Sequence, residues 1–246
     1  MNFIYETFAM FAEKYDINFS VIYSEYERTA YINGVLSTIE LTIVSIFFSV
    51  LIGILGVWLQ RSKYKAAHWF VTAYVQLFRN TPPLVQMLFF YFALGPLTPA
   101  VDMGGWEEPL IGGFGWAAVS LSLFCGAFNV EIFRSGIESV PKGMDEAATA
   151  LGFNKNQSFF KITLPLAFRT VIPAFTNNLV NLLKTTTLAY AIAVPEIMYV
   201  SNQIWSDNLN VVEMMVVVFA TYMILVGILV WLMHRIEHKL KLPGSH

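Results

Sequence analysis

Glu-Ala-Ala-Thr-Ala-Leu-Gly at residues 146–152 is followed at a fixed distance by Ile-Thr-Leu-Pro at residues 162–165, and this polar stretch lies between strongly apolar runs. Asp145 precedes a good helical segment that Gly152 can end, because glycine adopts the left-handed conformation of a helix C-cap without steric cost. A second short helix can follow from about residue 156 to 162, with Pro165 as its stop. The stretch therefore predicts a compact helix–turn–helix outside the bilayer, suited to a groove on a soluble partner.

The composition indicates a membrane protein. Of the 246 residues, 56% are hydrophobic and only 13% are charged, and the mean hydropathy is +0.57. A soluble chain of this length would carry far more charge on its surface. The net charge of −2 shows no basic bias, so nucleic acid is not an expected partner. The single Cys125 lies in an apolar run and is most simply a small buried hydrophobe.

Apolar runs predict an all-α fold with five transmembrane helices, since crossing a bilayer takes about 20 apolar residues. The polar helix–turn–helix falls in the loop 136–166 between the third and fourth of these helices. Residues 1–32 are expected to form a periplasmic or interfacial segment, and residues 236–246 a basic tail. The expected spans cover residues 35–59, 66–95, 112–133, 171–194 and 211–233.

Charge predicts the orientation. Eleven of the fifteen Lys and Arg residues lie in three places: the short loop 60–65 after the first span, the region 134–169, and the C-terminal tail. The loops 96–111 and 196–210 contain none. Basic loops remain in the cytoplasm, so the N-terminus is expected outside and the C-terminus inside. The helix–turn–helix then faces the cytoplasm.

The second expected span is interrupted by Arg-Asn-Thr-Pro-Pro at residues 79–83. A break in a spanning helix exposes backbone polar groups, which protein or a water-filled cavity must satisfy. Thr81 can cap a second half-helix that begins at Pro82, whose N-terminal end would favour an anionic group. The interruption therefore suits a substrate passage, and it equally suits a proline kink that serves packing alone.

Four ionisable residues lie within apolar runs: Glu40, Arg79, Glu131 and Lys184. A charge at mid-bilayer costs roughly 2.5 kcal/mol or more, so such residues usually face an interior. Glu131 and Arg134 are three residues apart and can simply pair on one helix face. Lys184 is the strongest single candidate for lining a pathway, with Glu40 as a counter-charge.

Four motifs together resemble the permeases of ATP-binding-cassette (ABC) importers. The Glu-Ala-Ala stretch and its Ile-x-Leu-Pro follow the signature loop of that family without a gap. Residues 77–86 (Leu-Phe-Arg-Asn-Thr-Pro-Pro-Leu-Val-Gln), 131–137 (Glu-Ile-Phe-Arg-Ser-Gly-Ile) and 181–188 (Asn-Leu-Leu-Lys-Thr-Thr-Thr-Leu) are similar to motifs of its polar-amino-acid branch. The resemblance runs from about residue 34 to 235 and implies a type I ABC importer permease domain at residues 33–235.

The resemblance implies partners and sites. The signature loop would seat in a cleft of a separate ATPase subunit, with coupling residues Glu146, Ala147, Ala148, Gly152, Leu164 and Pro165. A second permease, identical or paralogous, would complete the pathway, and a periplasmic binding protein would deliver substrate. The same loop also suits an ordinary cytoplasmic hairpin. Candidates for the substrate pathway are Arg79, Thr81, Pro82, Gln86, Lys184, Thr185 and Thr187.

No phosphate-binding Gly-x-x-x-x-Gly-Lys-Ser/Thr motif occurs, and the four histidines are scattered. We therefore expect no enzymatic activity, no metal and no cofactor in this chain, with ATP and Mg²⁺ held by the partner ATPase. The sequence predicts the membrane subunit of an ABC importer for polar amino acids in a bacterial inner membrane. Residues 237–244 and 78–80 most resemble glutamate/aspartate permeases. The alternative is a stand-alone secondary transporter or channel for a small polar solute.

Overall fold

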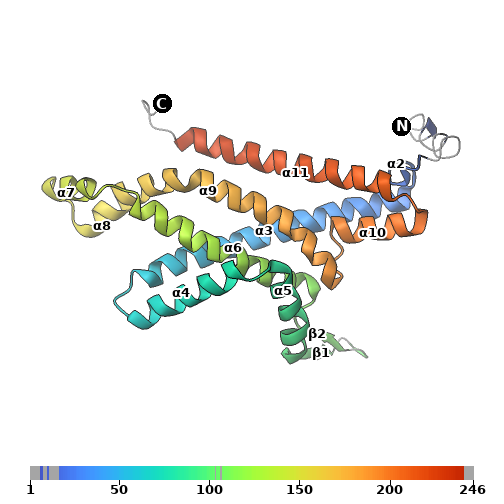
Figure 1. Cartoon of the computed structure of the whole chain (residues 1–246), viewed down its shortest axis with the longest axis horizontal. Coiled ribbons are helices and arrows are strands. Elements are labelled where there is room, and N and C mark those ends of the chain that lie inside the picture. The colour runs from blue at the N-terminus through green and yellow to red at the C-terminus, as the bar shows by residue number, and fades with distance from the viewer. Residues whose placement is uncertain (1–5, 8–9, 11–16, 103, 106, 241–246) are drawn as a thin grey trace. The chain divides into compact units, whose positions relative to one another are not determined.

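Helices dominate the computed structural model, which describes residues 6–7, 10, 17–102, 104–105 and 107–240 (Figure 1). The expected all-α membrane fold is confirmed. Parts of the segments 1–32 and 236–246, including residues 241–244 of the tail stretch that resembles glutamate/aspartate permeases, lie outside the described residues. The helices are α2 (Ser20–Tyr23), α3 (Glu25–Gln60), α4 (Lys65–Asn80), α5 (Pro83–Leu88), α6 (Gly113–Glu138), α7 (Lys142–Ala150), α8 (Lys155–Ser158), α9 (Leu164–Thr185), α10 (Ile197–Asn208) and α11 (Val211–Leu240).

Within the described residues, four helical runs are long and apolar enough to cross a membrane: Glu25–Gln60, Gly113–Glu138, Lys155–Ile192 and Val211–Lys239. The remaining expected span, at 66–95, is divided. Helix α4 ends at Asn80, and α5 with the π-helical turn Phe89–Leu94 follows from Pro83. Two consecutive prolines remove backbone donors, so a continuous helix cannot form through them. The five expected spans thus correspond to four long helical runs and one broken pair.

The chain forms two compact units, each made from segments far apart in the sequence. Helices α3, α6, α9 and α11 contribute residues to both. The first unit comprises residues 1–44, 83–121 and 183–227, and the second comprises residues 45–82, 122–182 and 228–246.

The core of the first unit joins α2, α3, α10 and α11. Its fully buried side chains include Ile197 and Met214. Gly34 permits close contact between α3 and α10, because a Cβ there would lie 3.1 Å from the side chain of Val200. The hydroxyls of Tyr31 and Thr221, 2.8 Å apart, connect α3 to α11. Small residues and interhelical hydrogen bonds of this kind hold membrane helices together, since lipid offers no hydrophobic drive between them.

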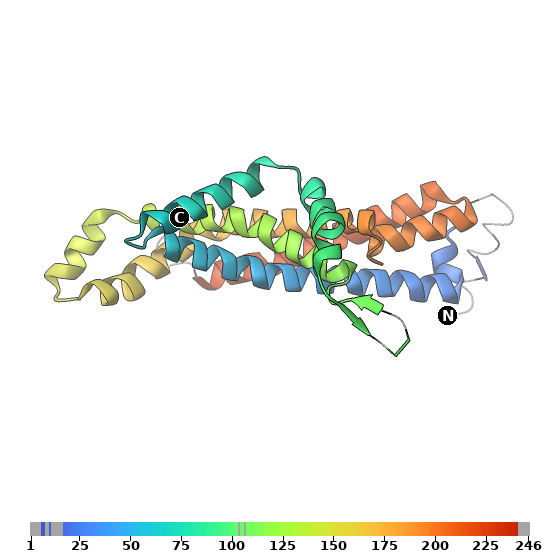
Figure 2. The same ribbon diagram turned by 90° about the horizontal axis from the view of Figure 1, so that it is seen from below.

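A short hairpin follows α5 in the first unit. Strands β1 (Ala100–Asp102) and β2 (Glu107–Pro109) pair antiparallel and project beyond α5 (Figure 2). The Asp102 carboxylate accepts hydrogen bonds from the backbone N–H groups of Gly104 and Gly105, which lowers its pKa. Both glycines have positive φ, a conformation that favours glycine. The hairpin thus places an acidic turn in a loop that contains no Lys or Arg.

The second unit packs α3, α4, α6 and α9. Val57, Val71, Val75 and Val130 form its apolar cluster. Two buried amides join the helices beside that cluster. The Asn178 amide donates to the Asn129 oxygen at 2.8 Å and to the carbonyl of Cys125, and the Asn129 amide donates to Ser49 Oγ at 3.2 Å. These polar contacts link α3, α6 and α9 where no water is available to satisfy the groups.

Candidate functional site

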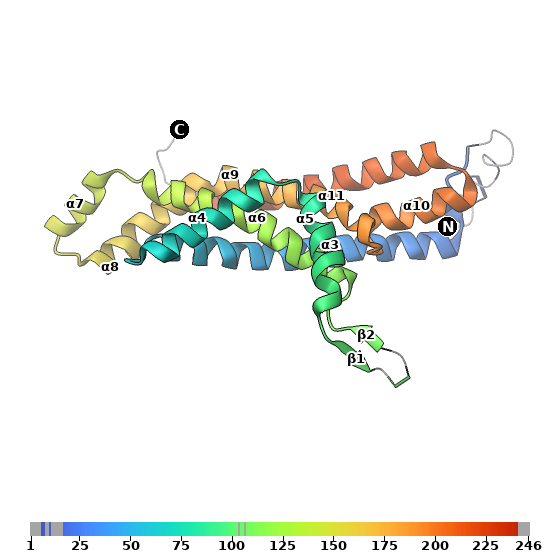
Figure 3. The same ribbon diagram turned by 60° about the horizontal axis from the view of Figure 1, so that its bottom comes forward.

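The expected helix–turn–helix is present as α7 and α8, which lie side by side in the second unit (Figure 3). Gly152 ends α7 as predicted, with φ +83°. The N–H of Phe153 bonds to the carbonyl of Ala148, and the N–H of Gly152 bonds to that of Thr149, both at 3.0 Å. These two bonds define a Schellman C-cap, which requires the left-handed residue that glycine supplies. The signature stretch therefore contains its own helix stop.

The second short helix starts earlier than expected and is reinforced by a capping box. The Asn154 side chain accepts from the N–H of Gln157, and the Gln157 side chain accepts from the N–H of Asn154. The Ser158 hydroxyl donates to the Asp145 carboxylate and so joins α8 to α7. The turn between the two short helices is thereby held by side chains of the loop itself.

The prediction that Pro165 stops the second helix is wrong. A π-helical turn, Phe159–Thr163, follows α8, and α9 begins at Leu164 and contains Pro165 in its first turn. The helical run Lys155–Ile192 therefore continues through the proline, and the π-helical turn changes the hydrogen-bond pattern directly before it. Leu164 and Pro165 thus lead from the loop into the long fourth span.

The surface of the helix–turn–helix combines a charge with exposed apolar side chains. Of the expected coupling residues, Glu146, Ala147, Gly152, Leu164 and Pro165 are exposed, whereas Ala148 is buried. The nearby side chains of Leu151 and Phe160 are 78% and 64% exposed. Large apolar side chains on a polar loop outside the apolar runs favour contact with another protein.

The pathway candidates on α4 belong to an ion-pair chain. Arg79 Nη1 lies 3.7 Å from Glu131 Oε2, and the Arg79 guanidinium stacks 5.2 Å above the ring of Phe128. The predicted pairing of Glu131 with Arg134 is confirmed at 2.8 Å, and Arg134 also binds Glu138 at 2.9 Å. Arg79 therefore has a counter-charge, Glu131, that was not predicted for it.

Lys184 lies in the last turn of α9, in the first unit. Its side chain is exposed and, among the described residues, makes no ion pair with Glu40, which is exposed as well. Glu40 as a counter-charge for Lys184 is thus not found. The hydroxyl of Thr187 donates to the Lys184 carbonyl at 2.8 Å. This bond joins the Thr187 hydroxyl to the backbone of its own helical run.

The remaining candidates occupy both sides of the break. The Thr81 hydroxyl donates back to the Leu77 carbonyl at 2.8 Å, at the end of α4. Helix α5 begins at Pro83, one position after the expected Pro82. Gln86 is buried on α5, in the first unit. Thr81 and Pro82 thus lie between α4 and α5, and Gln86 lies within α5.

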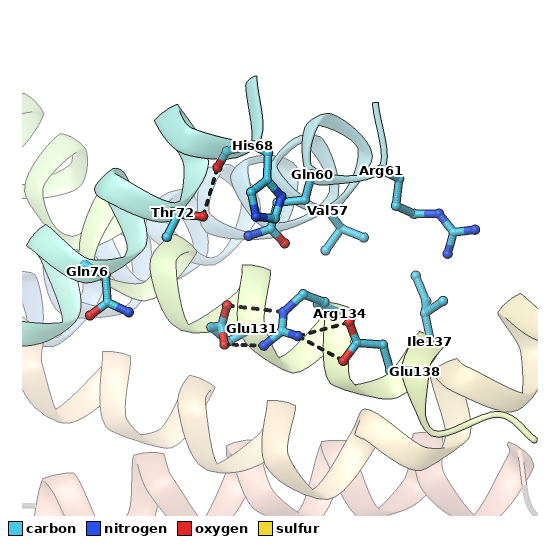
Figure 4. A pocket seen from close by; sticks show the side chains of 10 residues that line it. All are labelled: Val57, Gln60, Arg61, His68, Thr72, Gln76, Glu131, Arg134, Ile137 and Glu138. Carbon is cyan, nitrogen blue, oxygen red and sulfur yellow. Dashed lines mark hydrogen bonds and ion pairs between the residues drawn. The ribbon is translucent and has the colours of Figure 1, made fainter. Parts of the chain in front are cut away.

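A polar cavity of about 380 Å³ lies in the second unit, where the end of α3, the start of α4 and the end of α6 meet (Figure 4). Gln60, His68 and Thr72 line it opposite Glu131 and Arg134. Of these five residues, the sequence pointed only to Glu131 and Arg134, as a pair on one helix face. The others come from α3 and α4, and nothing in their spacing shows that they face α6.

The sequence also did not single out Glu196 as a buried ionisable residue. Its side chain is fully buried in the first unit and caps α10, accepting from the N–H groups of Met198 and Tyr199 at 3.0 and 2.9 Å. Burial raises its pKa to about 7, because removal from water disfavours the carboxylate. The sequence offered little signal for it, because the residues that favour the N-cap position are Asn, Asp, Ser, Thr and Gly.

The family described as "Binding-protein-dependent transport system inner membrane component" matches residues 50–242. The chain belongs to this family. This permease is 33% identical over 208 residues to the L-cystine transport system permease protein TcyB of Bacillus subtilis, covering 84% of this chain and 85% of that one. It is 30% identical over 210 residues to the arginine transport system permease protein ArtQ of the same organism, covering 85% and 92%.

Solved structures show the same fold. One described as an amino acid ABC transporter crystallised with histidines has a TM-score of 0.75 at 24% identity, covering 86% of this permease and 94% of that chain. The methionine ABC transporter MetNI has a TM-score of 0.71 at 23% identity, covering 89% and 100%. The chain is thus a multi-pass inner-membrane permease of ABC importers for amino acids, and it is not an enzyme. Its family implies an ATPase and a substrate-binding protein as partners.

Proposed function

We propose that this permease passes acidic amino acids, glutamate or aspartate, into the cell. The observation that carries the proposal is Lys184, an exposed cation within a candidate span that makes no ion pair among the described residues. A charge at membrane depth without a counter-charge is costly and usually marks a substrate or ion pathway. An anionic side chain passing Lys184 would provide the missing counter-charge.

Arg79 is a weaker candidate for that role. Its guanidinium is paired with Glu131 and stacked on Phe128, so an arriving carboxylate would have to compete with both contacts. Gln86, Thr185 and Thr187 can supply polar contacts to the amino-acid backbone of a substrate, and Thr81 and Pro82 lie at the break of the second span. Their roles in the pathway stay predictions.

The relatives do not decide the substrate, because their names refer to cystine, glutamine and arginine. The amino acids named for these relatives therefore differ in the charge of their side chains. The acidic assignment rests on Lys184 and on the resemblance of residues 78–80 and 237–244 to glutamate/aspartate permeases.

The helix–turn–helix α7–α8 is proposed as the contact with the ATPase. Its exposed Glu146 can pair with a basic group, and Leu151 and Phe160 can enter an apolar cleft. This assignment requires the loop to face the cytoplasm, with the N-terminus outside and the C-terminus inside. A second permease, identical or paralogous, would complete the pathway.

The substrate assignment is tested with Lys184→Met in the assembled transporter. We expect uptake of glutamate and aspartate to fall about tenfold or more, because a charge-assisted bond contributes roughly 1.5–3 kcal/mol. Complex yield and basal ATPase rate, measured on the same preparation, should stay unchanged. Glutamine, which has the same shape without the charge, should compete weakly with glutamate in the wild type.

The matched control is Lys65→Met, which removes an exposed cation from the first turn of α4. Normal glutamate uptake by Lys184→Met would show that Lys184 has no role in transport. Collapse of the complex would assign the residue to structure instead.

A further inference from the structure

The cavity between α3, α4 and α6 lies where two candidate spans end. The span Glu25–Gln60 and the span Gly113–Glu138 both finish at residues that line it. The exposed side chains of Trp58, Tyr64 and Trp69, between 68% and 77% accessible, lie on the same ends of α3 and α4. Exposed Trp and Tyr side chains collect at the headgroup level of a bilayer. The cavity is therefore placed at the boundary between lipid tails and water.

One wall of the cavity is an acceptor surface. Arg134 is held between two carboxylates, with Nη2 2.8 Å from Glu131 Oε2 and Nη1 2.9 Å from Glu138 Oε2 (Figure 4). With the further bonds from Nε and Nη1, they occupy most of the guanidinium donors, whereas each carboxylate oxygen keeps a further lone pair. Glu138 is 60% exposed, so its oxygens remain accessible. This wall can accept hydrogen bonds from a ligand cation.

Gln60 supplies an unsatisfied acceptor. Its Oε1 is buried and has no hydrogen-bond partner among the described residues, although the residue lines the cavity. A buried acceptor without a donor is destabilising, and the few such groups in native structures call for an explanation. A ligand N–H group in the cavity would satisfy it.

A cationic side chain, Arg61, lies at the edge of the cavity. Its guanidinium stacks 5.2 Å over the ring of Phe159. Stacking uses the face of the guanidinium and leaves the N–H groups at its edge for a planar or tetrahedral anion. Lys63 and Lys65 are exposed on the same turn between α3 and α4. A ligand with an anionic group would be held here.

We propose that the cavity binds a zwitterion whose ammonium contacts Gln60 and Glu138 and whose anionic group contacts Arg61, and that the phosphoethanolamine headgroup of a phospholipid supplies it. The volume of about 380 Å³ is in the range of small-molecule sites, about 300–1,000 Å³. A free amino acid has the same pair of charges. The ends of the spans and the exposed aromatic side chains favour the lipid. The proposal does not depend on which amino acid the permease transports.

The test uses the full chain with its co-purified subunits in nanodiscs of equal parts phosphatidylethanolamine, phosphatidylcholine and phosphatidylglycerol. Native mass spectrometry after transfer to detergent reports the lipid that stays bound. We expect phosphatidylethanolamine to be retained, because phosphatidylcholine lacks ammonium N–H donors and phosphatidylglycerol lacks a cation. Gln60→Met and Arg61→Met should each weaken this retention about tenfold, as expected for one lost hydrogen bond or ion contact.

Matched controls remove the same groups elsewhere. Gln203→Met changes an exposed glutamine on α10, and Arg235→Met removes a guanidinium that stacks 4.7 Å over Trp231. Both should retain lipid as the wild type does. Glu138→Gln removes the carboxylate that the proposed ammonium contacts. It serves as the second variant if Gln60→Met does not assemble, and it should also weaken retention of phosphatidylethanolamine.

Equal retention of the three lipids, or wild-type retention by the cavity variants, would overturn the proposal. A separate arm measures binding of free glutamate, by calorimetry, to the detergent-purified complex. Saturable binding that Gln60→Met and Arg61→Met both abolish, without selective lipid retention, would make the cavity a solute site and the lipid assignment wrong.

Discussion

Arg79 of α4 and Glu131 of α6 form an ion pair across 3.7 Å, and Glu131 is shared with Arg134 of its own helix. The two arginines therefore compete for one carboxylate. Of the two, only Arg134 has a second counter-charge within the described part of the chain, Glu138. Loss of Glu131 would therefore leave Arg79 without this counter-charge, whereas Arg134 would keep Glu138. The Arg79–Glu131 pair also connects the end of α4, in the broken second span, to the third span.

This arrangement predicts that Glu131→Gln destabilises the permease more than Arg79→Met does, because it leaves two cations with one carboxylate. The coupling energy from a double-mutant cycle should be about 0.5–1 kcal/mol, as for partly exposed ion pairs. Thermal unfolding of the purified complex measures both quantities. If Arg79→Met abolishes uptake at unchanged stability, Arg79 contacts substrate and the ion pair is secondary.

The Schellman cap predicts a sharp difference between two glycines of the helix–turn–helix. Gly152→Ala should lower ATP-driven uptake severalfold, because a Cβ at φ +83° costs about 1 kcal/mol and misplaces the turn. Gly143→Ala is the matched control, since Gly143 lies inside α7 with open space around it. Uptake in proteoliposomes with the ATPase present is the measurement. Equal uptake by the two variants would show that the turn does not transmit the ATPase cycle.

Charge reversal tests the same loop without changing its backbone. Glu146→Lys should abolish uptake, because it would repel a basic surface on the ATPase, while the permease still inserts in the membrane. Co-purification of the ATPase should fall together with uptake. Glu237→Lys in α11 changes charge by the same amount outside the loop and should be tolerated. Wild-type uptake by Glu146→Lys would exclude the proposed contact.

The raised pKa of Glu196 predicts the pH dependence of stability. The folded state holds this proton up to about pH 7, whereas the unfolded chain releases it near pH 4.5. Between these values the folded state binds more protons, so the free energy of unfolding falls as pH rises, by up to about 1.4 kcal/mol per pH unit. Above about pH 7 this contribution is constant.

Glu196→Gln should remove that slope, because an amide does not titrate in this range. Its single oxygen keeps one of the two cap bonds, which in the wild type go to different carboxylate oxygens. Chemical denaturation at pH 5, 6, 7 and 8 compares it with the wild type. The exposed Glu25→Gln in the first turn of α3 should leave the slope unchanged. A slope that persists in Glu196→Gln would assign it to another group.

The proposed orientation predicts the side on which the hairpin lies. A reporter enzyme that is active only in the cytoplasm, fused after Gly104, should be inactive, and the same fusion after Gly143 should be active. The reason is the absence of Lys and Arg from residues 96–111 and their abundance around α7. Activity at Gly104 would reverse the orientation and remove the basis for ATPase contact through α7.

Local features of this permease were predictable from the sequence because their causes are local. The cap at Gly152 needs hydrogen bonds only within residues 148–153, and the Glu131–Arg134 pair needs only three residues of helix. Length and apolar content predict spanning helices without knowledge of their partners. Pro165 is the local exception, since proline often ends a helix, whereas here the helical run continues through it.

Tertiary structure decided every feature that joins separate helices. Nothing in the spacing of Arg79 and Glu131 shows that α4 places one against the other, and nothing in Gln60 shows that its amide oxygen is buried beside α6. Glu196 follows the same rule, because its pKa is raised by burial, and only the folded chain shows that this carboxylate is buried. The hydrophobic pattern of a membrane helix indicates that a face is apolar. It does not indicate which helix packs against that face, because lipid and protein interiors are equally apolar.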